Sequence, residues 1–174
     1  KEGNQQCHDE YDSRRGSRLR LPIGYRSPFI AELVSEMLFD LNMRRGKRIL
    51  EQDPPQPAEV SVALAAFNTA LQQQPNDPGA ITEARLAVGF LRGREAYEQR
   101  DWLNTINSLR PVFAERASYL GNTTASMLFV SMMGAGDDYM AGNDLLNAYE
   151  MYSQACQLPL SDTTSACAKA SSVV

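Results

Sequence analysis

The stretch Gly136–Pro159 constrains the fold of this chain most, because its small and aromatic residues fall at the spacings that a tightly packed pair of helices requires. Two antiparallel helices joined by a short turn approach closely only where Gly or Ala faces the partner helix. Gly136 and Ala148 therefore mark a helix crossing, and Tyr139 and Tyr152 are expected to fill the space beside it. One hairpin cannot bury its whole apolar surface, so similar units are expected elsewhere in the chain.

The same arrangement recurs twice upstream. Ala63, Thr105 and Ala148 are equivalent small residues that lie 42 and 43 positions apart, and Gly46 and Gly93 precede the first two. The middle unit, with Thr in place of Ala, is the most divergent of the three. This recurrence predicts three hairpins of similar construction.

The pattern resembles the tetratricopeptide repeat (TPR), a helix-turn-helix unit with Gly, aromatic and small residues at set positions and a closing Pro. The resemblance covers about residues 34–160, and its period is longer than the usual ~34 residues, as in long-period bacterial repeats. It implies an all-α domain at residues 27–174, in which antiparallel hairpins stack as a right-handed superhelix. The expected units are hairpins at about residues 28–74, 78–116 and 123–158, and a short capping helix at about 161–172.

Residues 1–26 precede this domain and show no helical periodicity. They are dense in charge, Gly and Ser, which indicates an extended or disordered leader. Asp9, Glu10 and Asp12 lie beside its arginines, which disfavours a nucleic-acid site. The adjacent Cys7 and His8 have no second Cys/His cluster to complete a metal site.

The composition is that of a soluble globular chain, with 43% hydrophobic and 22% charged residues and a formal net charge of −4. No apolar run approaches the ~20 residues of a membrane-spanning helix, and no signal peptide is visible. Similar bacterial repeats follow a membrane anchor in longer chains, so a membrane-anchored parent chain or complex stays open. The resemblance therefore leans toward an extracytoplasmic or membrane-associated location.

Residues able to support catalysis are sparse. The chain has no recognisable pairing of a nucleophile with a base, no Gly-rich phosphate loop and no set of metal ligands. The paired Asp137 and Asp138 are interpreted as a solvated helix face. We therefore expect a non-enzymatic protein that needs no cofactor or metal.

The TPR resemblance implies a protein partner, held as an extended segment in a concave groove lined by the first helix of each hairpin. A competing hypothesis is a structural or accessory subunit that docks permanently into a larger, membrane-associated assembly, which apolar residues exposed at the ends of the stack would favour. Carried over by position, the groove residues are Asp40, Met43, Lys47, Phe90, Arg94, Tyr97, Val130, Met133, Asp137 and Met140.

Cys156 and Cys167 flank a predicted turn, so they are expected to lie close together. One interpretation is a pair of ordinary small residues in a helix interface, since free Cys is often buried. The other is a disulfide that locks the last hairpin, which would imply an oxidising compartment. Cys7 is expected to be remote from both.

Overall fold

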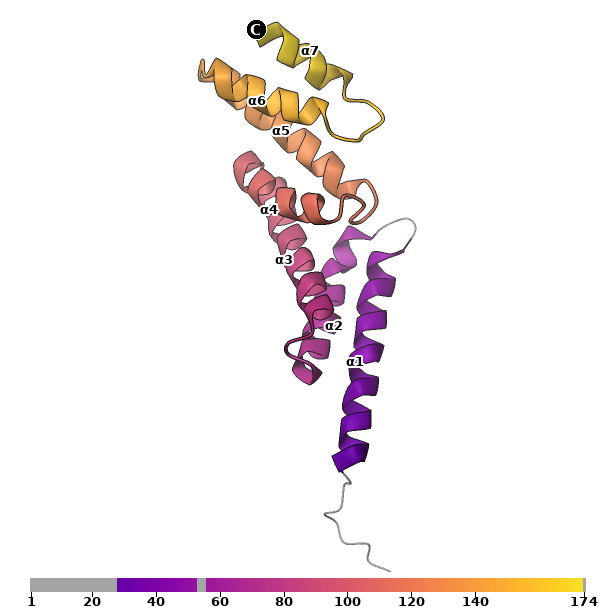
Figure 1. The fold of residues 1–174 in the computed structure, drawn as a ribbon. Coiled ribbons are helices and arrows are strands. Elements are labelled where there is room, and N and C mark those ends of the chain that lie inside the picture. Colours follow the sequence, from indigo (N-terminus) through magenta and orange to yellow (C-terminus); the bar gives the residue numbers. More distant parts are fainter. Residues whose placement is uncertain (1–27, 53–55, 174) are drawn as a thin grey trace, which may run out of the picture. The chain divides into compact units, whose positions relative to one another are not determined.

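The structure, a computed structural model, describes residues 28–52 and 56–173. The expected leader at residues 1–26 lies outside this part. The chain divides into two compact units, Lys1–Val34 and Ser35–Val174, so only the start of the first helix is described in the first unit. The elements are α1 (Pro28–Leu50), the 3-10 helix η1 (Pro57–Glu59), α2 (Val60–Gln73), α3 (Pro78–Glu98), α4 (Trp102–Glu115), α5 (Thr123–Ala141), α6 (Leu145–Cys156) and α7 (Thr164–Val173) (Figure 1).

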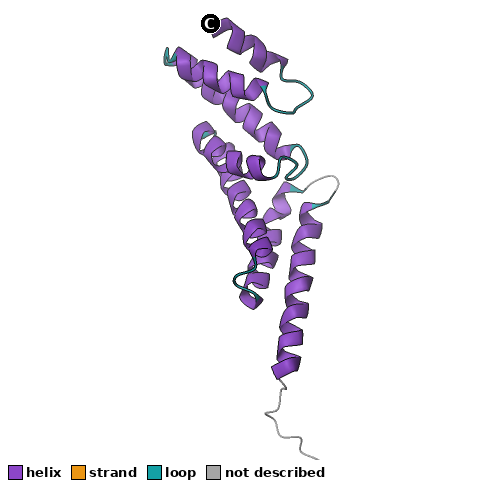
Figure 2. Ribbon diagram, in the orientation of Figure 1, coloured by secondary structure: helices purple, strands orange, loops and turns teal. Residues whose placement is uncertain are grey.

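All regular structure in the described residues is helical, which confirms the all-α class (Figure 2). From α2 onward, each helix packs against the next helix in the chain. The largest core cluster is centred on α3, α4 and α5 and includes Leu86, Phe90, Leu109 and Leu128. From Ser35 onward, α1 contributes to a second cluster with α2 and α3.

Close helix contacts recur at three glycines. Each glycine lies on the first helix of a pair, and a Cβ atom added there would overlap a large side chain on the second helix. The equivalent small residues Ala63, Thr105 and Ala148 have no exposed surface. The pairs are Gly46 with Phe67, Gly93 with Leu109, and Gly136 with Tyr152.

The turns between α3 and α4 and between α5 and α6 share one geometry. Each contains a residue in the left-handed region, Arg100 or Asn143, both at φ 58°. The next residue is an aspartate that caps the following helix, because its side chain accepts a hydrogen bond from the backbone N–H three residues further on. These cap bonds join Asn104 N to Asp101 Oδ1 at 3.1 Å and Asn147 N to Asp144 Oδ1 at 3.3 Å.

Replacing Ala148 by leucine is expected to lower the free energy of unfolding by roughly 1 to 2 kcal/mol. Ala148 is fully buried in a cluster with Tyr152 and Ala170, so extra methylene groups have no space. Thermal unfolding followed by circular dichroism measures the effect. Gln72→Leu is the control, because Gln72 is exposed on α2. Equal losses in both variants would contradict the assigned packing of α6.

Candidate partner-binding surfaces

Two of the expected groove residues lie in the core. Phe90 is fully buried on α3, where its ring lies 5.9 Å from that of Tyr119 between centroids. Met43 is buried against α2 in the cluster that contains Phe67. Both residues lie three positions before the glycine of their hairpin, and both face a neighbouring helix. A partner protein therefore cannot contact either side chain.

Two charged residues of the expected groove form hydrogen bonds and ion pairs with other residues of the chain. Arg94 donates a hydrogen bond to the backbone oxygen of Pro57 at 2.7 Å and lies 3.6 Å from Glu98. Asp137 accepts hydrogen bonds from Tyr152, at 2.5 Å, and from Lys169. These contacts tie α3 to the segment before α2, and α5 to α6 and α7.

The other six residues differ in exposure. Tyr97 and Met133 are half-buried and pack against the core. Asp40 and Lys47 on α1 and Val130 and Met140 on α5 are exposed. The structure therefore leaves only part of the expected groove set accessible.

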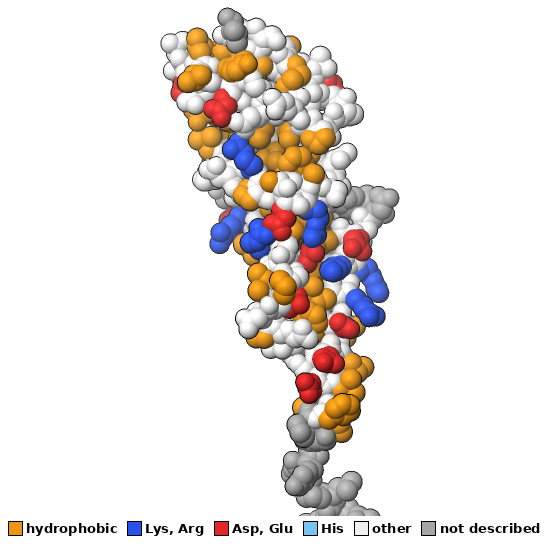
Figure 3. Space-filling view, in the orientation of Figure 1, with side chains coloured by type: hydrophobic (Ala, Val, Ile, Leu, Met, Phe, Trp, Pro, Cys, Tyr) orange, Lys and Arg blue, Asp and Glu red, His pale blue; other side chains and the backbone are white. Residues whose placement is uncertain are grey.

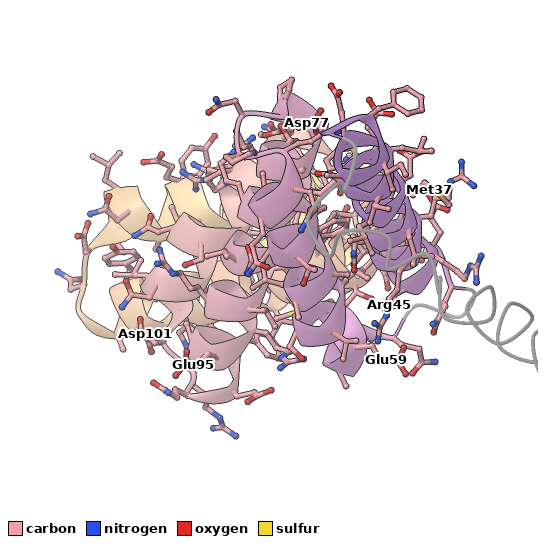
Figure 4. All side chains as sticks on the ribbon, turned by 90° about the horizontal axis from the view of Figure 1, so that it is seen from below. Met37, Arg45, Glu59, Asp77, Glu95 and Asp101 are labelled. Carbon is pink, nitrogen blue, oxygen red and sulfur yellow. A yellow bond between two sulfur atoms is a disulfide. The ribbon has the colours of Figure 1, made fainter. Side chains whose placement is uncertain are left out.

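A group of exposed apolar side chains lies on α1. Met37, Leu38 and Leu41 form what we call the outer face of α1, with 64%, 41% and 62% of their surfaces exposed. Gly46, nine residues after Met37, lies about 180° further round the helix and contacts α2. Figure 4 shows Met37 on the side of α1 that points away from α2. Among the described residues of the second unit, α1 thus has one apolar side that packs and one that does not.

A pocket of about 570 Å³ lies between the end of α1, α3 and the α4–α5 loop. Within it, Arg116 donates to both carboxylate oxygens of Glu83, at 3.0 and 2.7 Å. The Glu83 side chain is only 9% exposed, whereas that of Arg116 is 38% exposed. The hydrogen bond to Glu83 raises the pKa of Arg116 although partial burial opposes it.

Tyr119 borders the same pocket and is almost completely buried. The Arg116 guanidinium carbon lies 5.8 Å from the centre of its ring, a cation–π distance. Among the described side chains, the Tyr119 hydroxyl is the buried polar group without a hydrogen-bond partner. Burial raises the pKa of this phenol, and the neighbouring Glu83 adds to that effect. The next residue, Leu120, has a left-handed backbone with φ 54°.

These pocket residues were not anticipated from the sequence. Glu83 and Arg116 are 33 positions apart and belong to no recognisable motif. Arg116 follows α4 as its C-terminal capping residue, so helical periodicity does not assign it a partner. The one signal available was the short break in helical periodicity between the two helices, at residues 116–122.

Helix α7 is fastened to α6 by a disulfide between Cys156 and Cys167, whose Cα atoms are 4.9 Å apart. That separation lies within the range that a bridge requires, as expected for this pair. Lys169 on α7 also lies over the Tyr152 ring, 5.2 Å from its centre. Burial raises the pKa of Asp137, but the hydrogen bonds from Lys169 and Tyr152 outweigh it, so the net pKa is lowered.

Within residues 28–52 and 56–173, no cluster of three or more His, Cys, Asp or Glu side chains could hold a metal ion. None of the helices in that part combines the length and the apolar character needed to cross a bilayer. Cys7 and His8 lie outside the described residues.

Comparison with known proteins returned no matching family model, no matching curated protein and no matching solved structure.

Proposed function

We propose that this chain is a non-catalytic protein–protein interaction module, built as a TPR-like stack of helix hairpins, which binds a protein partner through the outer face of α1. The exposure of Met37 and Leu41 carries this proposal. Large apolar side chains grouped on one helix face lower the free energy when a partner covers them, and such patches mark interaction sites.

The recurring construction of the hairpins supports the TPR-like part of the proposal. Gly93 and Leu109 in one hairpin and Gly136 and Tyr152 in the next lie at the same separation of 16 residues. The same turn and aspartate cap join the two helices of each of these hairpins. Stacked units of this kind present long helix surfaces, which is how helical-repeat proteins bind others.

The electrostatics support a non-catalytic role. Each shifted carboxyl or guanidinium pKa among the described residues has a structural cause in a pair or a helix cap, as with Arg116, Asp137 and Asp162. Arg116 donates hydrogen bonds to both carboxylate oxygens of Glu83, so this pair also has a structural role.

The outer face of α1 is favoured over the concave groove as the partner surface. Arg94, the central cation of the expected groove, already donates to Pro57. An exposed apolar face at the first helix also favours a second candidate, a structural subunit held permanently in a larger assembly. Permanent interfaces are the more apolar class, and Met37, Leu38 and Leu41 lie together without a charged residue between them on that face.

Site-specific photo-crosslinking in the natural host tests the proposal. A photoreactive amino acid at Leu41 is expected to give a covalent adduct with a protein, identified by mass spectrometry. The same substitution at Leu146 on α6 is the control, because Leu146 is 76% exposed but lies away from α1. Absence of any protein adduct at Leu41, or equal adducts at both positions, would overturn the assignment of this surface. If the crosslinked protein co-purifies with the unmodified chain at a fixed ratio through every purification step, the second candidate, a permanently bound structural subunit, is favoured.

A further inference from the structure

We infer that the partner of the outer face of α1 is a second copy of this chain, bound with the two α1 helices antiparallel. This inference rests on the proposed protein-binding role of α1. It is carried by the spacing of the apolar residues and by the order of the charges along the helix.

The apolar residues have the spacing of a helix-pairing seam. Within the second unit, Met37 and Leu38 lie four and three residues before Leu41. Apolar residues that alternate at three and four positions keep one face of a helix against another helix over several turns. A helix is therefore the partner element that fits this face.

The charges on α1 change sign along its length. Glu36 and Asp40 precede Leu41, and Arg44, Arg45 and Arg48 follow it, and all five side chains are exposed. Figure 3 shows acidic side chains nearer the start of α1 and basic ones nearer its end. The contact between Arg44 and Asp40, at 4.0 Å with both side chains mostly exposed, does not use up these charges.

This order makes the helix complementary to itself in one orientation only. If two α1 helices pair antiparallel, the acidic half of each lies along the basic half of the other, whereas parallel pairing places like charges together. A two-fold symmetric interface uses the same patch on both copies, so one exposed face satisfies both partners. The arginine stems that continue the seam past Leu41 can also cover apolar surface of the other copy.

A membrane surface is a poorer fit to the same face. Helices that lie on anionic lipid bilayers carry Lys and Arg beside their apolar face. On α1 the residues that flank Met37 and Leu41 include Glu36 and Asp40, which an anionic surface would repel. The charge order therefore favours a second helix of the same sequence.

The first experiment measures the mass of the purified chain by sedimentation equilibrium over a range of concentrations. We expect a reversible dimer of the 19.3 kDa chain. Leu41→Asp should raise the dimer dissociation constant at least ~100-fold, because each dimer would bury two unpaired carboxylates. Leu146→Asp, a more exposed leucine on α6, should leave the constant unchanged, and circular dichroism should show intact helix content in both variants.

The second experiment tests the orientation by charge reversal and rescue. Glu36→Lys with Asp40→Lys should weaken the dimer about 10-fold or more, because the reversed half then faces the partner's arginines. Adding Arg44→Glu and Arg48→Glu to the same chain should restore dimerisation, since the new lysines then face the new glutamates of the other copy. Parallel pairing predicts no loss in the first variant, so a wild-type-like constant there would overturn the antiparallel arrangement.

The outcomes separate this inference from the proposed function. A chain that stays monomeric up to about 1 mM, while Leu41 crosslinks to a different protein, overturns the second copy and leaves the protein-binding role intact. A Leu41 crosslink within the same chain, or binding to anionic vesicles that Leu41→Asp abolishes, overturns both. Larger open assemblies in place of a dimer overturn the symmetric pairing, because contacts between unlike surfaces do not close.

Discussion

Replacing Arg116 by methionine is expected to lower the free energy of unfolding by about 3 kcal/mol. The change removes both hydrogen bonds to Glu83 and leaves a carboxylate of which only 9% is exposed without a partner. Losing one member of a buried ion pair costs several kcal/mol, because the remaining charge keeps its desolvation penalty. We place the effect at the lower end of the usual range because Arg116 is itself 38% exposed.

Urea denaturation measures the free energy of unfolding. Two matched variants show whether the unpaired Glu83 carboxylate causes the loss. Arg85→Met removes an arginine that pairs with Glu115 between the same two helices at the surface, where pairs contribute at most about 1 kcal/mol. The double change Glu83→Leu with Arg116→Met removes both charges, so it should recover most of the loss. If the double variant is as unstable as the single one, packing rather than the unpaired carboxylate is responsible.

The construction of the helices could be predicted from the sequence because it depends on neighbours in the chain. Apolar periodicity and the aspartates at 77 and 101 place helix starts locally, and the side chains of both residues cap helices. Asp144, rather than the preceding Asn143, caps α6. The reason is that Asn143 adopts φ 58° in the turn, which moves the cap one residue along.

The candidate surfaces were harder to predict, because they depend on which helix faces which. The family resemblance placed Phe90 and Met43 in a partner groove, and the sequence did not show that neighbouring helices cover both of them. The Glu83–Arg116 pair joins residues from two helices with no pattern to connect them. The outer face of α1 illustrates the converse. Its apolar residues look like core in the sequence, and only the packing of α1 on α2 through Gly46 shows that Met37 and Leu41 point elsewhere.

Loss of the disulfide between Cys156 and Cys167 is expected to lower the free energy of unfolding by about 2 to 3 kcal/mol. The two cysteines are 11 residues apart, and closing a loop of that length in the unfolded chain accounts for most of this amount in the chain-entropy description. The buried residues of α7 are two small ones, Ala166 and Ala170, so little apolar burial opposes its detachment from α6. We therefore expect α7 to unfold locally before the rest of the chain when the bridge is absent.

Hydrogen exchange of the α7 amides, compared between the oxidised chain and the double variant Cys156→Ser with Cys167→Ser, measures this detachment directly. Protection should fall in α7 and stay high in α3 and α4, which lie in the main core cluster. Lys169→Met separates the bridge from the other link to α5 and α6. It removes the partly exposed pair with Asp137 and the contact with the Tyr152 ring but keeps the disulfide, and its cost should stay below about 1 kcal/mol. If Lys169→Met exposes the α7 amides as much as loss of the bridge does, the charge contacts rather than the covalent link hold the helix. Unchanged protection in the double serine variant would show that Ala166, Ala170 and their neighbours on α6 suffice to keep α7 in place.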